Sequence, residues 1–278
     1  MADNTVMQTL YSKEWVSAYE QKQSWLRNCC QIEGEVAGDN FIFIIEGVAD
    51  EARERGANGN IPYASDDQAS ATCALKEYHH LVRKNHFRVY ASSVPQRTSM
   101  QNRGVVAVNY KTDQLIIDQL ETTTYQTSNA GTGAAMTLKF LLEMRTILDE
   151  NNVPDDGERY CTLTPRAMSQ ALDVNQFTSF DFVTDKPYMK NVQWREWQGI
   201  KFAMHPNLPG KGTSTASCFM WHKAAIGHAM NMGAIQTKIG ENDEQDYSWA
   251  RASSYQGSKA LQLSGIVEMV HDDTAALG

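Results

Sequence analysis

The segment from Gln31 to Ser92 constrains the fold most, because it is hard to place inside an ordinary compact domain. It contains a β-branched and aromatic run, Phe41 to Ile45, that predicts a strand. From Gly56 to Thr72 the chain is polar and rich in turn-forming residues, with too few large apolar side chains to anchor it. From Cys73 to Ser92 it returns to β-favouring residues interleaved with bases. We therefore expect a long two-stranded excursion with a mobile tip, which is uncommon unless it acts outside its own domain.

A helix with tryptophans on one face is predicted before this excursion, between Leu10 and Cys30. Its face is marked at three- and four-residue steps by Trp15, Ala18, Lys22, Trp25 and Cys29. Such an aromatic stripe must be buried. Its partner is either the core of its own chain or, as we favour, a neighbouring copy contacted by an extended N-terminal arm.

Three further helices are predicted after the excursion. Apolar residues at helical spacing mark Thr98 to Thr122, a helix spanning about 33 Å at 1.5 Å per residue. A second amphipathic helix is predicted from Met136 to Asn151, ahead of Pro154. Thr164 and Pro165 are typical of an N-cap and first helical position, and they begin the third helix.

Strands and short elements fill the rest of the chain without a regular βαβ alternation. The predicted strands are Glu158 to Leu163, Val192 to Met204, Ala216 to Trp221, Ile235 to Ile239, Tyr247 to Tyr255 and Ala260 to Val270, and Lys223 to Met232 is predicted as a short helix. This mixture indicates an α+β fold.

The charge is unevenly distributed along a chain whose net charge is -8. From Lys76 to Arg97 there are five bases and one acid, and from Glu241 to Asp273 there are seven acids and two bases. Two such patches suit complementary contacts between identical copies, although each could be an ordinary solvated face. The overall acidity argues against a protein that grips phosphate.

Enzyme signatures are largely absent from the sequence. Gly131-Thr132-Gly133 begins like a dinucleotide fingerprint, but Met136 stands where the third glycine belongs. His79 and His80 would face opposite sides of a strand, which prevents them from forming a ligand pair. The sequence therefore predicts no catalytic residue, no metal site and no cofactor. A cytosolic hydrolase would have to bring together distant residues such as Cys161 and His205.

The five cysteines are Cys29, Cys30, Cys73, Cys161 and Cys218, without any C-x-x-C spacing, and we interpret them as reduced. No run approaches the roughly 20 apolar residues of a membrane span. Met1 to Leu10 lacks the features of a secretion signal, so we expect a soluble protein.

The order of these parts resembles the major capsid (coat) proteins of tailed bacteriophages, whose Hong Kong 97-type fold is shared with encapsulins. The stretch from Leu141 to Pro154, followed by Glu158 to Pro165, looks like that family's passage from a helix into its axial domain. Phe219 to Ala229 is similar to its late strand–helix turn, and Tyr255 to Leu261 to its final strand.

This resemblance implies an α+β tailed-phage capsid fold in four parts. They are an N-terminal arm with a helix (1–30), an extended β-hairpin loop (31–92), a peripheral domain with a long spine helix (93–152 and 241–278) and an axial domain of mixed sheet and short helices (153–240).

The implied function is that of a structural protein whose copies form the hexamers and pentamers of an icosahedral shell around double-stranded phage DNA, without sequence-specific contact. A portal and a separate scaffolding protein are implied partners, with assembly in the host cytoplasm and a final location in the virion. The residues expected at contacts between subunits are Trp15, Trp25, Lys76, Arg83, Lys84, His86, Arg88, Glu241, Asp243, Glu244 and Asp246. The alternatives are an encapsulin-like compartment shell, another virion component and the hydrolase.

Overall fold

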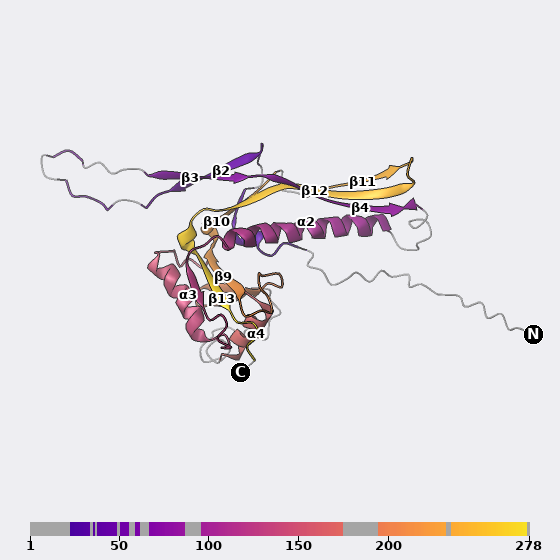
Figure 1. Ribbon diagram of the computed structural model, residues 1–278. Coiled ribbons are helices and arrows are strands. Elements are labelled where there is room, and N and C mark those ends of the chain that lie inside the picture. Colours follow the sequence, from indigo (N-terminus) through magenta and orange to yellow (C-terminus); the bar gives the residue numbers. More distant parts are fainter. Residues whose placement is uncertain are drawn as a thin grey trace, which may run out of the picture. The chain divides into compact units, whose positions relative to one another are not determined.

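The computed structural model divides the chain into two compact units (Figure 1). The smaller unit takes its described residues from 23–24, 77–86, 96–111 and 235–254, and the larger from within 25–76, 112–231 and 255–276. Helix α2 (Gln96–Leu120) and strand β12 (Tyr247–Ala260) each contribute residues to both units. The described residues are 23–33, 36, 38–48, 51–55, 59–61, 67–86, 96–174, 194–231 and 235–276.

A six-stranded mixed sheet forms the centre of the larger unit. Its strands, in order, are β5 (Gln126–Ser128), β13 (Ile266–His271), β9 (Ala216–His222), β6 (Arg159–Leu163), β8 (Ile200–Met204) and β7 (Arg195–Trp197). All residues of β6 and β9 are buried, as expected for strands covered on both faces.

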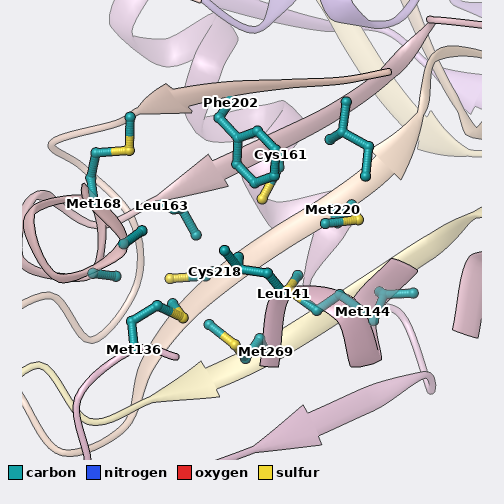
Figure 2. Close-up of a cluster of buried hydrophobic side chains, with 14 of the residues drawn as sticks. Met136, Leu141, Met144, Cys161, Leu163, Met168, Phe202, Cys218, Met220 and Met269 are labelled. Atoms are coloured by element: carbon teal, nitrogen blue, oxygen red, sulfur yellow. The ribbon is translucent and has the colours of Figure 1, made fainter. Parts of the chain in front are cut away.

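Two hydrophobic clusters lie on opposite faces of this sheet. Cys218 and Met220 of β9 belong to the cluster in Figure 2, which includes residues of α3 (Leu138–Glu150) and α4 (Pro165–Asp173). The alternate residues Phe219 and Trp221 belong to a second cluster, which includes Ile116 of α2. The strand period of two therefore lets one strand contribute to both clusters.

A smaller sheet and a hairpin complete the larger unit. Strand β1 (Gln31–Glu33) pairs in parallel with β10 (Ile226–Met230), which pairs antiparallel with the last residues of β12. Strands β2 (Asn40–Glu46) and β3 (Gln68–Ala74) form a separate two-stranded hairpin.

The smaller unit combines strands with the first part of α2. Strand β11 (Gln236–Asn242) pairs antiparallel with the first residues of β12, and β4 (Lys76–Asn85) also pairs with β12. Gly104 allows close approach of the helix, because a Cβ there would lie 2.9 Å from the Cβ of Ala252.

The three helices predicted after the excursion are confirmed, with bounds shifted by a few residues. Thr164 caps α4 as predicted, because its side chain accepts a hydrogen bond from the Ala167 N–H at 3.2 Å. All five cysteines are free and buried, which confirms the prediction of reduced thiols.

The prediction of a short helix from Lys223 to Met232 is wrong. A single 3-10 turn, η2 (Lys223–Ala225), leads directly into β10, whose five residues are all buried. Because β10 is buried on both faces, its sequence lacks the alternation that would distinguish a strand from a helix. Pairing with β12 decides in favour of the strand.

The excursion also differs from expectation on its returning side. Residues 68–72, expected in the mobile tip, belong to β3, and residues 76–85 pair with β12 instead of extending the hairpin. Most of the predicted helix from Leu10 to Cys30 lies outside the described residues. Its described end is the 3-10 turn η1 (Arg27–Cys29).

The last predicted strand, Ala260 to Val270, is interrupted. The 3-10 turn η4 (Leu263–Gly265) separates the end of β12 from β13. The segment from Val192 to Met204 likewise contains two strands, since β7 and β8 form a hairpin whose turn places Gln198 and Gly199 at positive φ.

Candidate functional site

The β2–β3 hairpin is anchored to its own chain through one face. Phe43 and Cys73 are almost completely buried and pack with Ala229 of β10. The Phe43 ring lies so close to Gly227 that a Cβ there would come within 2.6 Å of it. Since Gly227 has no side chain, the aromatic ring can lie directly on the backbone of β10.

The opposite face of the hairpin is apolar and exposed. Ile42 retains 57% and Ile44 retains 73% of its accessible surface. They lie opposite the uncharged Thr72 and Ser70 in the strand register, between Asn40 and Glu46 on the same face. Burying each isoleucine fully would contribute about 1.5–3 kcal/mol. This face gains that energy only if another surface covers it.

The hairpin continues beyond its strands as exposed chain. The Gly47 N–H donates to the Asp67 carbonyl at 2.7 Å, which closes the strand ends. Beyond that bond, Val48 and Ile61 are 99% and 79% exposed. Val48 and Ile61 are therefore apolar side chains that the described residues leave exposed.

In the smaller unit, the basic and acidic residues predicted to meet between subunits partly meet within the chain. His86 Nδ1 lies 3.8 Å from an Asp246 carboxylate oxygen, and the His86 N–H donates to the Asp246 carbonyl at 3.1 Å. Arg97 forms an ion pair with Glu241, and the Arg83 guanidinium lies 5.1 Å from the centre of the Tyr247 ring. These contacts stabilise the β4–β12 region of a single subunit.

The remaining predicted contact residues lie in different environments. Lys76, Asp243 and Glu244 are exposed. Lys84 is partly buried, and burial, followed by repulsion from Arg103, lowers the pKa of its ammonium group. Trp15 and Arg88 lie outside the described residues.

Trp25 lies at an anchoring point that the sequence did not reveal. The buried Asp113 carboxylate of α2 accepts the backbone N–H groups of Trp25 and Leu26, each at 3.2 Å. Its Oδ2 also lies 3.4 Å from His205 Nε2, and the Trp25 ring meets the His205 ring edge-on at 5.9 Å. Asp113 lies within the predicted helix from Thr98 to Thr122, and no local pattern distinguishes a buried acceptor from a solvated carboxylate there.

The exposed isoleucines were also missed, for a related reason. Phe41 to Ile45 is apolar at every position, so the run has no polar side to show which residues face outward. The signal that could have identified Ile42 and Ile44 is the weakness of β3, whose Ala and Ser residues cannot cover both faces of a hairpin.

Cys161 and His205 do not form a hydrolytic pair. The Cys161 side chain lies in the apolar cluster of Figure 2, and burial, then repulsion from Cys218, raises the pKa of its thiol well above the usual value. A reactive cysteine requires a thiolate in accessible surroundings. His205 instead contacts Asp113.

Among the described residues, no group of three or more His, Cys, Asp or Glu side chains could hold a metal ion. No helix in the described part of the chain is both long and apolar enough to cross a bilayer.

The sequence matches the profile of a family described as phage capsid protein, over residues 3–273. Comparison with curated protein sequences gave no significant match.

Solved phage structures share the fold at low sequence identity. A chain described as "Mycobacterium phage Che8" is 16% identical, with a TM-score of 0.75 over 99% of this chain and 100% of that one. The capsid of cyanophage P-SCSP1u is also 16% identical, with a TM-score of 0.75 over 96% and 93%. The head structure of Helicobacter pylori bacteriophage KHP40 is 10% identical, with a TM-score of 0.74 over 97% and 95%. The expected α+β capsid fold is confirmed.

Proposed function

Since the chain belongs to the phage capsid protein family, we propose that it is the major capsid subunit that forms the shell of a phage head. The observation that carries this proposal is the family match over nearly the whole chain. The exposed apolar face of the β2–β3 hairpin supports it, because a shell subunit needs surfaces that its copies can cover.

The mechanism is assembly. Each subunit of a closed shell contacts several neighbours, so modest contacts add up to a stable particle through multivalency. In this mechanism the Ile42 and Ile44 face of one subunit is covered by a sister subunit. The exposed charges of Lys76, Asp243 and Glu244 contribute complementary contacts at the rim of such interfaces.

The proposed capsid function also includes the arrangement, partners and contents of the shell. Subunits are arranged in hexamers and pentamers of an icosahedral shell, with a portal and a separate scaffolding protein as partners and double-stranded DNA as contents. The net charge of -8 supports this role, because an acidic subunit does not adhere to packed DNA. We also propose that the shell assembles in the host cytoplasm and that the subunit has no catalytic activity. The proposal keeps the four-part domain division and the contacts between subunits expected of Trp15, Trp25 and Arg88.

Negative-stain electron microscopy of the purified full-length protein, alone and co-expressed with its scaffolding protein, tests the proposal. We expect hollow, closed particles of uniform size. A species that remains a single subunit under both conditions would contradict it. The contents of the particles then separate a phage head, which holds DNA, from an encapsulin-like compartment, which holds enzymes.

A charge-reversal variant tests the basic segment separately. Arg83→Glu, Lys84→Glu and Arg88→Glu together should leave the subunit folded but prevent particle formation. Arg53→Glu with Arg55→Glu is the control, because these two arginines are exposed bases that lie outside the segment. Particles of normal size and yield from the triple variant would refute a role for this segment in assembly.

A further inference from the structure

His271, the last residue of β13, faces an oxygen acceptor at both ring nitrogens. The residue is completely buried. Its Nδ1 lies 3.1 Å from Asn129 Oδ1, and its Nε2 lies 2.8 Å from Gln170 Oε1. A neutral imidazole has one N–H group and one lone pair. A neutral ring could therefore donate a hydrogen bond to only one of these oxygens, and the lone pair on its other nitrogen would face the second oxygen.

The orientation of the Asn129 amide is fixed by its other hydrogen bonds. Its Nδ2 donates to the Ala134 carbonyl at 3.2 Å, and its Oδ1 also accepts the Asp272 N–H at 3.1 Å. Turning the amide over would set its NH2 group against the Asp272 N–H. The atom that faces Nδ1 is therefore an oxygen.

The Gln170 amide is fixed in the same way. Its Nε2 donates to the Ala275 carbonyl at 3.1 Å, and its Oε1 also accepts the Met136 N–H at 2.9 Å. The atom that faces Nε2 is therefore also an oxygen. Both ring nitrogens of His271 must carry a proton for all of these bonds to form.

The surroundings of the ring supply negative charge. Asp273 Oδ1 lies 3.9 Å from His271 Nε2. Burial lowers the pKa of His271, whereas the carboxylates of Asp273 and Asp272 oppose this shift. The two fixed oxygen acceptors favour the protonated ring, as the carboxylates do. A buried charge is tolerated when it is both paired and hydrogen-bonded.

We propose that His271 is a buried imidazolium that acts as a pH-sensitive clamp on the end of the larger unit, joining β13, α4 and the loop at 129–133. This proposal does not depend on the function proposed above. When the ring loses its proton, it loses one of the two hydrogen bonds, and either α4 or the loop is released from the ring.

The adjoining carboxylates extend the clamp to two exposed glycine-containing loops. Asp272 accepts the Gly133 N–H at 3.0 Å, and its hydrogen bond from Thr274, then that from Gly133, lowers the pKa of its carboxyl group. Asp273 accepts the Gly212 N–H at 3.0 Å and the Thr164 hydroxyl at 2.6 Å. The charge of His271 therefore stabilises the carboxylates that hold both loops in place.

The other titratable groups on the packed segments do not replace the histidine as a proton switch. Arg166 of α4 donates to the Ala275 carbonyl at 2.8 Å. Burial raises the pKa of the Cys218 thiol on β9 to about 12. Lys211, next to Gly212 in the loop held by Asp273, is exposed.

NMR of the purified full-length protein, labelled with ¹⁵N at histidine, tests the protonation state directly at pH 7. We expect both ring nitrogens of His271 to carry protons. The signal is assigned through its contacts with the Asn129 and Gln170 side chains, so the assignment does not depend on a variant that folds. A neutral ring, with one unprotonated nitrogen, would overturn the proposal.

Thermal melting as a function of pH provides a second test. At pH 6, His271→Gln should melt about 5 °C or more below the wild type, since two charge-assisted hydrogen bonds are lost. The clamp requires the two oxygen acceptors and the carboxylates to outweigh burial and to hold the folded-state pKa above the unfolded value. The melting difference should then be largest at pH 6 and shrink as the pH rises through the folded-state pKa.

His228 is the matched control, because it is as buried as His271. Its Nδ1 lies 2.9 Å from Ser258 Oγ, and its Nε2 has no hydrogen-bond partner among the described residues. The melting difference between wild type and His228→Gln should not shrink between pH 6 and pH 9. The same shrinkage in both variants would show a general effect of pH and contradict the clamp.

Discussion

The six-stranded sheet and the β2–β3 hairpin belong to the same unit, yet the chain covers them to different extents. Every residue of β9 is buried, with Phe219 and Cys218 on opposite faces. In β2 the inward Phe43 is buried, while the outward Ile44 remains exposed. The comparison teaches that the described residues of the chain cover the sheet on both faces, whereas they leave Ile42 and Ile44 of the hairpin exposed, on the face that we propose a sister subunit covers.

The largest effect on stability is expected from a truncation in the sheet. Phe219→Ala removes a fully buried ring and leaves a cavity, which should lower the free energy of unfolding by about 3–5 kcal/mol. Chemical denaturation measures this loss. The control Phe219→Leu should lose less, and an equal loss in both variants would contradict cavity formation as the cause.

Acid should weaken the larger unit through His228, a buried histidine of β10, the strand on which the hairpin packs. Burial, then the nearby Arg27, lowers the pKa of His228 to about 4. An unfolded histidine takes up a proton near pH 6.5, before the folded one does. Stability is therefore lost as the pH falls from about 6.5 to about 4, by up to about 3 kcal/mol.

Denaturation of His228→Gln at several pH values checks this effect. The variant should lack this part of the acid sensitivity while keeping the contribution of its carboxylates. If wild type and variant lose stability in parallel between pH 6.5 and pH 4, the histidine is not responsible.

An intermediate effect is expected where the chain enters the larger unit. Asp113→Ala leaves the N–H groups of Trp25 and Leu26 buried without their acceptor and should cost about 1–3 kcal/mol. Asp113→Asn keeps an acceptor oxygen and should recover part of the loss. Hydrogen exchange at Trp25 and Leu26 checks the local effect, and unchanged protection in the alanine variant would show that the carboxylate does not hold this segment.

The smallest effect on the subunit, but a decisive one on assembly, is expected in the hairpin. Ile42→Ser with Ile44→Ser should change the free energy of unfolding by less than about 0.5 kcal/mol, because both side chains are exposed. The same variant should fail to form particles. Ile42→Val with Ile44→Val is the control that keeps the apolar face. Normal particle yield from the serine variant would remove the distinction between the two regions.

The sequence predicts the helices well and the strand pairing less well, for physical reasons. The Thr164 cap and the period of the apolar residues in 98–122 are local signals, and both predicted their elements. The pairing of β4 with β12 joins residues far apart in the chain, and no local pattern encodes it. Ile226 to Met230 is buried on every side, so its alternation was absent and a helix was predicted.

The contact residues show the same division. Composition identified two oppositely charged segments, but it could not show that His86 and Asp246 meet within one subunit. The exposed face of Ile42 and Ile44 was hidden because its neighbours in sequence are equally apolar. Exposure depends on which face packs against β10, and that contact is set by tertiary structure.

Hydrogen–deuterium exchange of unassembled subunits and of assembled particles tests the central claim most directly. Backbone amides of β6 and β9 should be protected in both states. Those of β2 and β3 should exchange faster in the subunit, since a two-stranded hairpin covered on one face only is weakly protected, and become protected in the particle. Equal protection of the hairpin in both states would contradict its completion by a sister molecule.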